Sequence, residues 1–226
     1  FYSDPYLVYG DDGTIYYSTI ALDAQVQNAW IVVARSTDHG TTWESAEVNP
    51  PTDCTTGLGG GQGQGPCMDH PWLAIGPDKL DPTRQALYAA YLATTANDYP
   101  TVVIRSTDGG KTWGIPGSPG KSLPVFSPNG SGAFYNLITP AVADDGAVHL
   151  VAVGLAGDEH GSTQNAVYYA RSDDGCQTRS QPKIISAIGK PVPFEQPVVA
   201  VDGATVYVVY VAGSNKGDWD VMLASS

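Results

Sequence analysis

The sequence of 226 residues predicts an all-β fold, and three observations support this prediction. Its apolar residues form short runs, rich in β-branched and aromatic side chains, which is typical of strands. Asp-Gly pairs that suit tight turns separate several of these runs. We find no long stretch with the 3.6-residue apolar period of a helix. The predicted strands are 14–20, 30–34, 86–92, 101–104, 147–153, 166–170 and 205–211.

The expected hairpin turns share one composition. Glycine adopts a positive φ without steric cost, and aspartate can hydrogen-bond its own backbone. These turns are expected at Asp11-Asp12-Gly13, Asp145-Gly146 and Asp202-Gly203.

An octapeptide recurs along the chain. Residues Ser36–Trp43 read STDHGTTW and residues Ser106–Trp113 read STDGGKTW, and each copy follows an apolar run that ends in arginine. In a third copy, Ser172–Arg179, the residue Cys176 replaces glycine and Arg179 replaces tryptophan. We expect the third turn to be looser or differently packed.

A polar residue followed by proline opens another apolar run about 30 residues before each octapeptide, and once more near the end of the chain. Four antiparallel strands repeated every 60–70 residues form the pattern of a β-propeller blade. The chain then holds about three and a half blades, with units near 1–68, 69–138, 139–195 and an incomplete 196–226. The opening pairs are Asp4-Pro5, His70-Pro71, Thr139-Pro140 and Gln196-Pro197.

The octapeptide resembles the Asp-box, or BNR repeat, of sialidases and related secreted propellers. The resemblance implies a propeller that normally has six blades, so this chain would be part of a longer propeller or would close its ring with another copy. It also implies that the boxes are structural, with aspartate accepting turn N–H groups, glycine taking positive φ and tryptophan burying surface. The box residues are Ser36, Asp38, Gly40, Trp43, Ser106, Asp108, Gly110 and Trp113.

The sequence departs from the sialidase pattern at the arginines that would grip a carboxylated sugar. Ser3 stands where the resemblance places the first of them, and none of the five arginines is expected at a channel mouth, since Arg84 falls in a predicted hairpin loop and the other four lie at the octapeptides. Asp23 falls loosely where the family has its acid/base aspartate, but no motif surrounds it. A true sialidase is therefore not expected.

Candidate site residues gather where the first strand of each unit begins, because these strands line the channel of a propeller. Carboxylates, amides and aromatic rings suit sugar hydroxyls and apolar sugar faces, and paired carboxylates can cleave a glycosidic bond. The alternatives are that these carboxylates cap strand starts or hold Ca²⁺, although no cofactor is expected to be required. The catalytic candidates are Asp4, Asp69 and Glu195, and the substrate-binding candidates are His70, Asn136, Thr139, Gln196, Tyr99 and Trp219.

Charge and cysteine content limit the possible partners of the protein and its cellular compartment. With 11 Lys and Arg against 23 Asp and Glu, the chain is a poor partner for nucleic acid or an anionic membrane, and no apolar run suits membrane insertion. Cys54 and Cys67 flank a glycine-rich loop that a disulfide would close, with two buried free thiols as the alternative and Cys176 unpaired. The pair, the acidic balance and the resemblance suggest a secreted or cell-surface protein. No signal peptide is visible, so mature numbering or truncation is expected.

Three functions stay open at this point. The chain could process glycans as a glycoside hydrolase or lyase, bind a glycan or protein without catalysis, or form a structural module of a larger cell-surface protein. Paired carboxylates at catalytic spacing would favour the first function, and a shallow aromatic-lined face the second. A channel packed against other domains would favour the third.

Overall fold

A computed structural model describes residues 2–25, 28–49, 52–53, 68–93, 100–127, 135–157, 163–187, 190–213 and 217–226. Within these ranges the chain is all β, as predicted, and has no helix that could cross a membrane. The predicted Cys54–Cys67 disulfide and the candidate residue Tyr99 lie outside the described residues.

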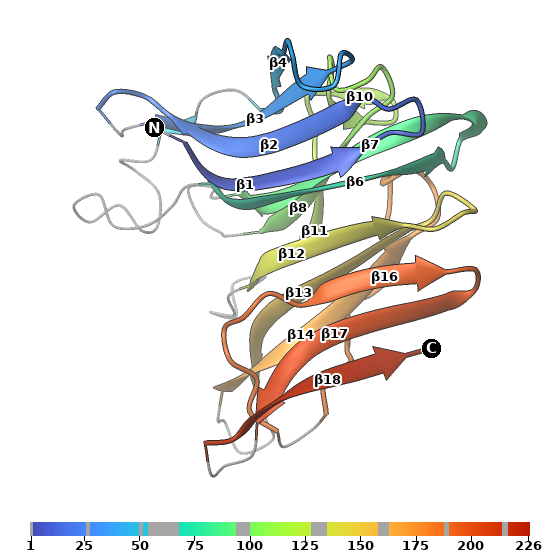
Figure 1. The fold of residues 1–226 in the computed structure, drawn as a ribbon. Coiled ribbons are helices and arrows are strands. Elements are labelled where there is room, and N and C mark those ends of the chain that lie inside the picture. The colour runs from blue at the N-terminus through green and yellow to red at the C-terminus, as the bar shows by residue number, and fades with distance from the viewer. Residues whose placement is uncertain are drawn as a thin grey trace.

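Four antiparallel sheets follow one another along the chain, from blue to red in Figure 1. Sheet 1 contains β1 (Tyr2–Tyr9), β2 (Ile15–Leu22), β3 (Asn28–Ser36), β4 (Glu44–Glu47) and the short β5 (Thr52–Asp53). Sheet 2 contains β6 (Met68–Asp78), β7 (Asp81–Ala93), β8 (Thr101–Ser106) and β11 (Leu123–Phe126). Sheet 3 contains β12 (Tyr135–Val142), β13 (Val148–Gly157), β14 (Thr163–Ser172) and β15 (Lys183–Ile184). Sheet 4 contains β16 (Val198–Asp202), β17 (Thr205–Gly213) and β18 (Trp219–Ser225), and a small ribbon pairs β9 (Gly114–Ile115) with β10 (Ser118–Pro119).

The sheets are joined by apolar cores between their faces. One cluster lies between sheets 1 and 2, a second between sheets 2 and 3, and a third between sheets 3 and 4. Sheets 2 and 3 are therefore buried on both faces, which explains why their strands read as nearly continuous apolar runs. Fully buried members of the three clusters include Ile31, Val103 and Val167.

The predicted hairpin turns are confirmed. Gly13, Gly146 and Gly203 have φ values of 81°, 79° and 56°, which only glycine adopts readily. Each lies between the first and second strands of its sheet.

The octapeptides fold as hydrogen-bonded turns after the third strands. In the first copy, Asp38 Oδ1 accepts Thr42 N at 2.8 Å and Ser36 Oγ accepts Gly40 N at 2.8 Å. The hydrogen bonds from Thr42 lower the pKa of the Asp38 carboxyl to about 2. The second copy repeats both bonds at 2.9 Å through Asp108 and Ser106. These residues thus have a local structural role, as the sequence predicted.

Of the two alternatives expected for the third turn, a looser turn is not found, and a different packing is. Ser172 Oγ accepts Cys176 N at 3.0 Å and Asp174 Oδ1 accepts Thr178 N at 2.9 Å, so the bond pattern is complete. Cys176 adopts the positive φ of the missing glycine, at 66°. The packing does differ, because Arg179 donates to the carbonyl of Pro124 instead of filling the place of a tryptophan.

The second and third turns pack on the sheet that precedes their own. A Cβ atom added to Gly109 of the second turn would lie 3.2 Å from Arg35 Nη1 of sheet 1, and one added to Gly175 of the third turn would lie 3.3 Å from the Leu80 side chain of sheet 2. Trp113 is 6% exposed in this setting, whereas Trp43 is 45% exposed, which corrects the expectation that both are buried. The physical reason is that no described sheet lies before the first turn.

Sheet 4 carries exposed apolar side chains on its outer face. The row Val198, Val209 and Leu223 runs across its three strands, and all three side chains are at least 43% exposed. In sheets 2 and 3 a following sheet covers the corresponding face. Sheet 4 therefore has the two apolar faces of an inner sheet.

Candidate functional site

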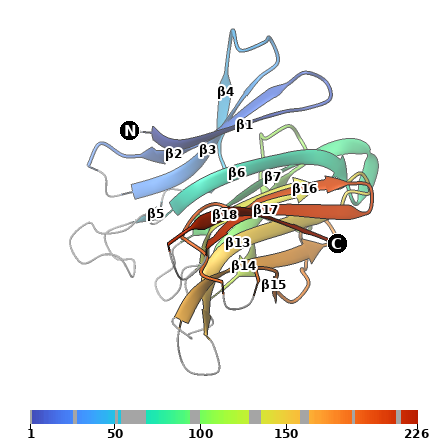
Figure 2. The ribbon, with the colours of Figure 1, turned by 60° about the horizontal axis from the view of Figure 1, so that its bottom comes forward.

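The first strands of the four sheets lie side by side. β1, β6, β12 and β16 contact one another in this order and run in the same direction in Figure 1 and Figure 2. Their starting ends therefore meet at one end of the molecule, and their hairpins meet at the other. Most of the candidate residues lie at the starting end.

A β-bulge interrupts β1, β6 and β12 at the same level. In each strand two residues face a single residue of the second strand, and the first of the two has a positive φ: 53° at Asp4, 46° at His70 and 56° at Leu137. A non-glycine residue in this region costs about 1–3 kcal/mol, and such strain and bulges concentrate at functional sites. In a regular strand, successive side chains point to opposite faces of the sheet. A bulge changes these directions, so neighbouring side chains can point the same way.

The register also corrects the alignment of the repeats. The residue that corresponds to Pro5 and Pro71 is Ile138, two positions before Pro140. The Thr139-Pro140 pair is therefore not the structural counterpart of Asp4-Pro5.

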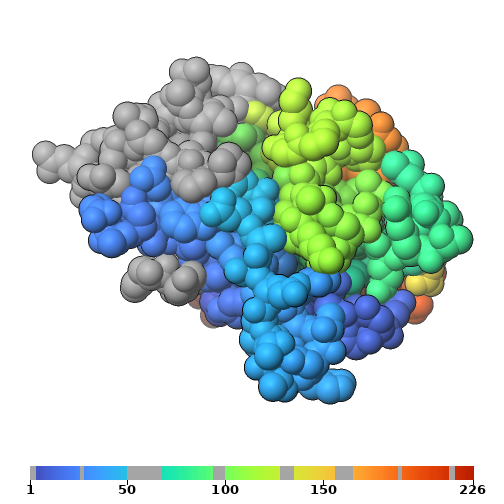
Figure 3. Space-filling view, turned by 90° about the horizontal axis from the view of Figure 1, so that it is seen from above, coloured from blue at the N-terminus to red at the C-terminus, as the bar shows by residue number. Residues whose placement is uncertain are grey.

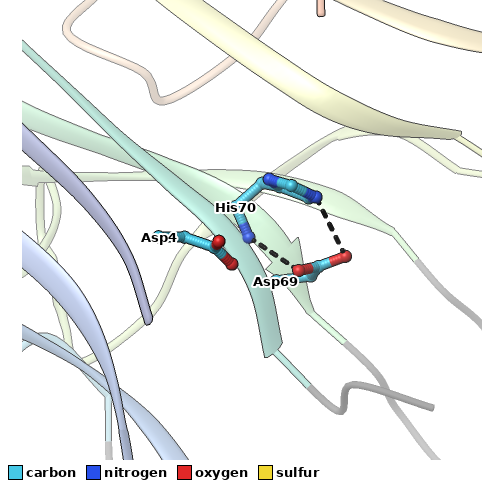
Figure 4. A group of neighbouring side chains, drawn as sticks. All are labelled: Asp4, Asp69 and His70. Carbon is cyan, nitrogen blue, oxygen red and sulfur yellow. Dashed lines mark hydrogen bonds and ion pairs between the residues drawn. The ribbon is translucent and has the colours of Figure 1, made fainter. Parts of the chain in front are cut away.

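The bulges of β1 and β6 bring Asp4, Asp69 and His70 together. One side-chain atom of each residue lies within 4.8 Å of one atom of each of the others, and the three side chains point toward one another in Figure 4. His70 donates its backbone N–H to Asp69 Oδ1 at 3.1 Å, and its Nε2 lies 3.5 Å from Asp69 Oδ2. Asn136 of β12 donates through Nδ2 to Asp69 Oδ2 at 2.8 Å, so three strands contribute to the cluster.

Burial distinguishes Asp69 within this cluster. Its side chain is 15% exposed, and burial raises the pKa of its carboxyl. The hydrogen bond from Asn136 and the charge of His70 lower this pKa, and the charge of Asp4 raises it, with a net increase. Asp69 is therefore a carboxyl that holds a proton at higher pH than an ordinary aspartate, as a general acid must.

A cavity of about 160 Å³ lies beside the carboxylates. Asp4 and His70 line it, together with Tyr6 and Trp72, whose rings lie 3.9 Å apart at an angle of 31°. Asp69 is next to this cavity but does not line it. Gln196 lines it from the fourth sheet, and the buried Nε2 atom of Gln196 has no hydrogen-bond partner among the described residues. A buried donor without a partner is unfavourable, and a bound ligand would satisfy it.

Sequence reasoning missed Tyr6 and Trp72. Each directly follows the proline of its opening pair, so the two aromatics occupy the same place in the repeat. That coincidence was a usable signal for a shared aromatic pair.

Three of the remaining candidates do not join the site, and Asn136 joins it only through Asp69. Glu195 is exposed and does not line the cavity, which its neighbour Gln196 reaches instead. The hydroxyl of Thr139 is buried and donates to the Pro197 carbonyl at 2.6 Å, so it ties sheet 3 to sheet 4. Asn136 is buried and positions Asp69, and Trp219 is 53% exposed at the start of β18, outside the cavity.

Asp23 is also outside the cluster. Its Oδ2 accepts a hydrogen bond from Asn28 Nδ2 at 2.7 Å, across the start and end of the loop between β2 and β3. None of the five arginines lines the cavity, as expected.

Solved structures share this fold. A Clostridium thermocellum α-L-arabinofuranosidase is 17% identical over 99% of this chain and 68% of its own, with a TM-score of 0.54. A Penicillium chrysogenum α-L-arabinanase is 16% identical over 100% of this chain and 62% of its own, with a TM-score of 0.61. A Trypanosoma rangeli sialidase is 16% identical over 100% of this chain and 36% of its own, with a TM-score of 0.53.

At this identity the likeness shows the fold, which is that of propeller glycosidases. This chain spans less than two thirds of the length of the arabinanase and of the sialidase. No family model matches the sequence, and no curated protein matches it.

Proposed function

We propose that this chain is the carbohydrate-processing part of a glycoside hydrolase, with Asp4 and Asp69 as its acid pair. The observation that carries the proposal is the bulge-built approach of the two carboxyls, which have oxygens within 4.8 Å of each other. The carboxyl groups of a retaining glycosidase lie about 5–5.5 Å apart and those of an inverting enzyme about 6.5–9.5 Å apart. The observed approach favours the retaining reaction.

The environments of the two residues assign their roles. Asp69, whose pKa is raised, donates its proton to the glycosidic oxygen as the bond to the sugar breaks. Asp4 lines the cavity and attacks the anomeric carbon as a carboxylate, which forms a glycosyl ester. Asp69 then takes a proton from the water that releases the sugar. Asn136 keeps the Asp69 carboxyl in place during both steps.

The cavity favours a single uncharged sugar unit. At about 160 Å³ it is smaller than the roughly 300–1,000 Å³ of typical ligand pockets. Its ionisable lining is the carboxyl group of Asp4 and the imidazole of His70, with no guanidinium to pair with a sugar carboxylate. The Tyr6–Trp72 pair offers an apolar face, and Gln196 offers a donor for a hydroxyl group.

A panel of 4-nitrophenyl glycosides tests this proposal, including the α-L-arabinofuranoside because similar structures are named arabinofuranosidases. Asp69→Asn and Asp4→Asn should each lower kcat/KM by about 100-fold or more, whereas Asp202→Asn at an exposed hairpin should not. Proton NMR of the first-formed product should show retention of the anomeric configuration. Absence of turnover for every glycoside, or equal rates for the Asp69 and Asp202 variants, would reject the hydrolase.

A cation is the second candidate for the same residues. Asp4, Asp69 and His70 together form the group that could hold a metal ion, and carboxylate oxygens suit Ca²⁺. Calorimetry with CaCl₂ tests this reading. Tight binding that is lost in Asp4→Asn, with no glycoside turnover, would favour a cation-dependent binding module over the hydrolase.

We also propose that further sheets complete the propeller ring, supplied by the same polypeptide or by another copy of this chain. The exposed apolar face of sheet 4 and the exposed Trp43 support this, because the equivalent surfaces between the described sheets are covered. Light scattering tests the second source, because a stable monomer would argue against another copy of this chain. Unaltered solubility of the Val209→Glu and Leu223→Glu variants would show that substitution of the exposed apolar row has no effect and would argue against a covering sheet.

A location outside the cell is likewise a proposal. It is supported by the acidic composition and by the resemblance of the octapeptides to those of secreted propellers. Fractionation of the producing cells tests it, and recovery of the protein only from the cytosol would refute it.

A further inference from the structure

A second cavity lies far from the candidate site. It has a volume of about 470 Å³ and lies between the β1–β2 hairpin and the β6–β7 hairpin, at the opposite end of the first strands. In Figure 3 these hairpins, in dark blue and blue-green, lie beside the second octapeptide turn. The volume is within the roughly 300–1,000 Å³ of ligand pockets. No residue of this cavity belongs to the proposed catalytic group.

The polar groups of the cavity are held in place by the fold. Gln85 Oε1 accepts the backbone N–H of Asp11 at 3.0 Å, which joins sheet 2 to the hairpin of sheet 1. Asp12 Oδ1 accepts Thr14 N at 2.9 Å, and Arg84 Nε donates to the buried Asp78 at 2.9 Å. Arg84 lies on β7, and not in the hairpin loop that the sequence suggested. Groups held in this way can bind a ligand at a low ordering cost.

Several groups retain hydrogen-bonding capacity toward the cavity. The Nε2 atom of Gln85 and the Asp11 carboxylate make no hydrogen bond within the described ranges, and Arg84 contacts Asp78 and Asp81 through Nε. Donors and acceptors therefore face the same space, above an apolar floor that includes Ile75 and Leu87. An inorganic anion would be repelled by the carboxylates of Asp11 and Asp12, and a simple cation would be repelled by the guanidinium of Arg84.

Hydroxyl groups fit this mixture because each hydroxyl both donates and accepts. A sugar ring also offers an apolar face to the floor of the cavity. We propose that this cavity is a second carbohydrate-binding site, which takes a short segment of an uncharged oligosaccharide. It holds the chain of a polymeric substrate or a neighbouring glycan, and it does not depend on catalysis at Asp4 and Asp69.

Binding of defined oligosaccharides tests the site. Arabinohexaose, xylohexaose and cellohexaose are titrated into the protein by calorimetry and followed by saturation-transfer NMR. Gln85→Glu keeps an oxygen that can accept from Asp11 N but removes the free Nε2 donor, so it should weaken binding about tenfold or more. Gln177→Glu, the same substitution at an exposed residue of the third turn, is the matched control and should bind as the parent does.

Asp4→Ala separates this site from the candidate catalytic site. At least one hexasaccharide should bind Asp4→Ala with unchanged affinity and lose affinity in Gln85→Glu. The proposal is overturned if no hexasaccharide binds the parent, if Gln85→Glu binds as tightly as Gln177→Glu, or if only Asp4→Ala removes binding. Should Gln85→Glu fail to fold, as judged by its melting curve, Asp11→Asn carries the same comparison. None of these outcomes depends on whether the chain hydrolyses a glycoside.

Discussion

The ion pair between Asp78 of β6 and Arg105 of β8 allows a sharp test of how the strands of sheet 2 are held together. Arg35 and Arg105 occupy the same place in the repeat, each one residue before an octapeptide. Arg105 is 7% exposed and pairs with the fully buried Asp78, whereas Arg35 pairs with Glu44, whose side chain is 74% exposed. Substituting methionine at the two positions changes one buried pair and one exposed pair in matched surroundings.

The expected losses differ because of burial. Removing one partner of a buried pair costs about 3–5 kcal/mol, since the other charge is left uncompensated. Asp78 would keep Arg84 and the backbone N–H of Leu80, so we expect a loss near the lower limit, about 3 kcal/mol, for Arg105→Met. The exposed pair contributes about 0–1 kcal/mol, and this is the expected loss for Arg35→Met.

Urea unfolding at pH 7 measures both free energies of unfolding. Burial raises the Asp78 pKa, but hydrogen bonds from Arg105, Leu80 and Arg84 outweigh it, so the carboxyl is ionised when folded. The stability gained from this lowered pKa is present above the ordinary aspartate value of about 3.9 and is lost as pH falls through the folded value. The difference in free energy of unfolding between Arg105→Met and Arg35→Met should therefore become smaller at acid pH. Equal losses at pH 7 would refute the assignment of the buried pair as a major joint between β6 and β8 within sheet 2.

Three further predictions concern single residues. Asn136→Ala removes the hydrogen bond that lowers the Asp69 pKa, so the alkaline limit of the kcat/KM pH profile should move to higher pH. An unchanged limit would show that Asp69 is not the group that donates the proton. Trp113→Ala should cost about 3–5 kcal/mol in thermal unfolding and Trp43→Ala about 1 kcal/mol, because only Trp113 is buried. His149 is buried, and burial lowers its pKa, so the free energy of unfolding should fall as pH drops below about 6.5. In His149→Gln, urea unfolding should show a free energy that depends less on pH between about pH 7 and 5.

The sequence was sufficient for the strands and turns because their signals are local. The period-two runs place β13 and β17 to within a few residues, and the Asp-Gly pairs give the positive φ of Gly146 and Gly203. Cys176 shows the strength of the local bonding, since the octapeptide turn forms even with a side chain at the glycine position. All of this depends on neighbours within the same few residues.

The site was only partly predictable because it depends on strand pairing. The position before a proline suggested Asp4 and His70, which the structure brings together. The bulge that does so is defined by the partner strand, which no single strand reveals. For the same reason the proline repeat suggested Thr139, whose hydroxyl instead ties two sheets. Glu195 and Gln196 precede β16, so no strand pattern in the sequence decides which of the two lines the cavity.

The contact of the second and third octapeptide turns with the preceding sheet gives the chain a direction of assembly. Gly109 lies against Arg35 of sheet 1, and Gly175 lies beside Arg105 of sheet 2. Part of each of these two sheets is therefore covered by residues that are synthesised one repeat later. During translation a sheet would thus remain incompletely covered until the third strand of the next one had left the ribosome. Folding should then advance from the N-terminus in steps that lag synthesis by one repeat, with the most recent sheet always the least protected.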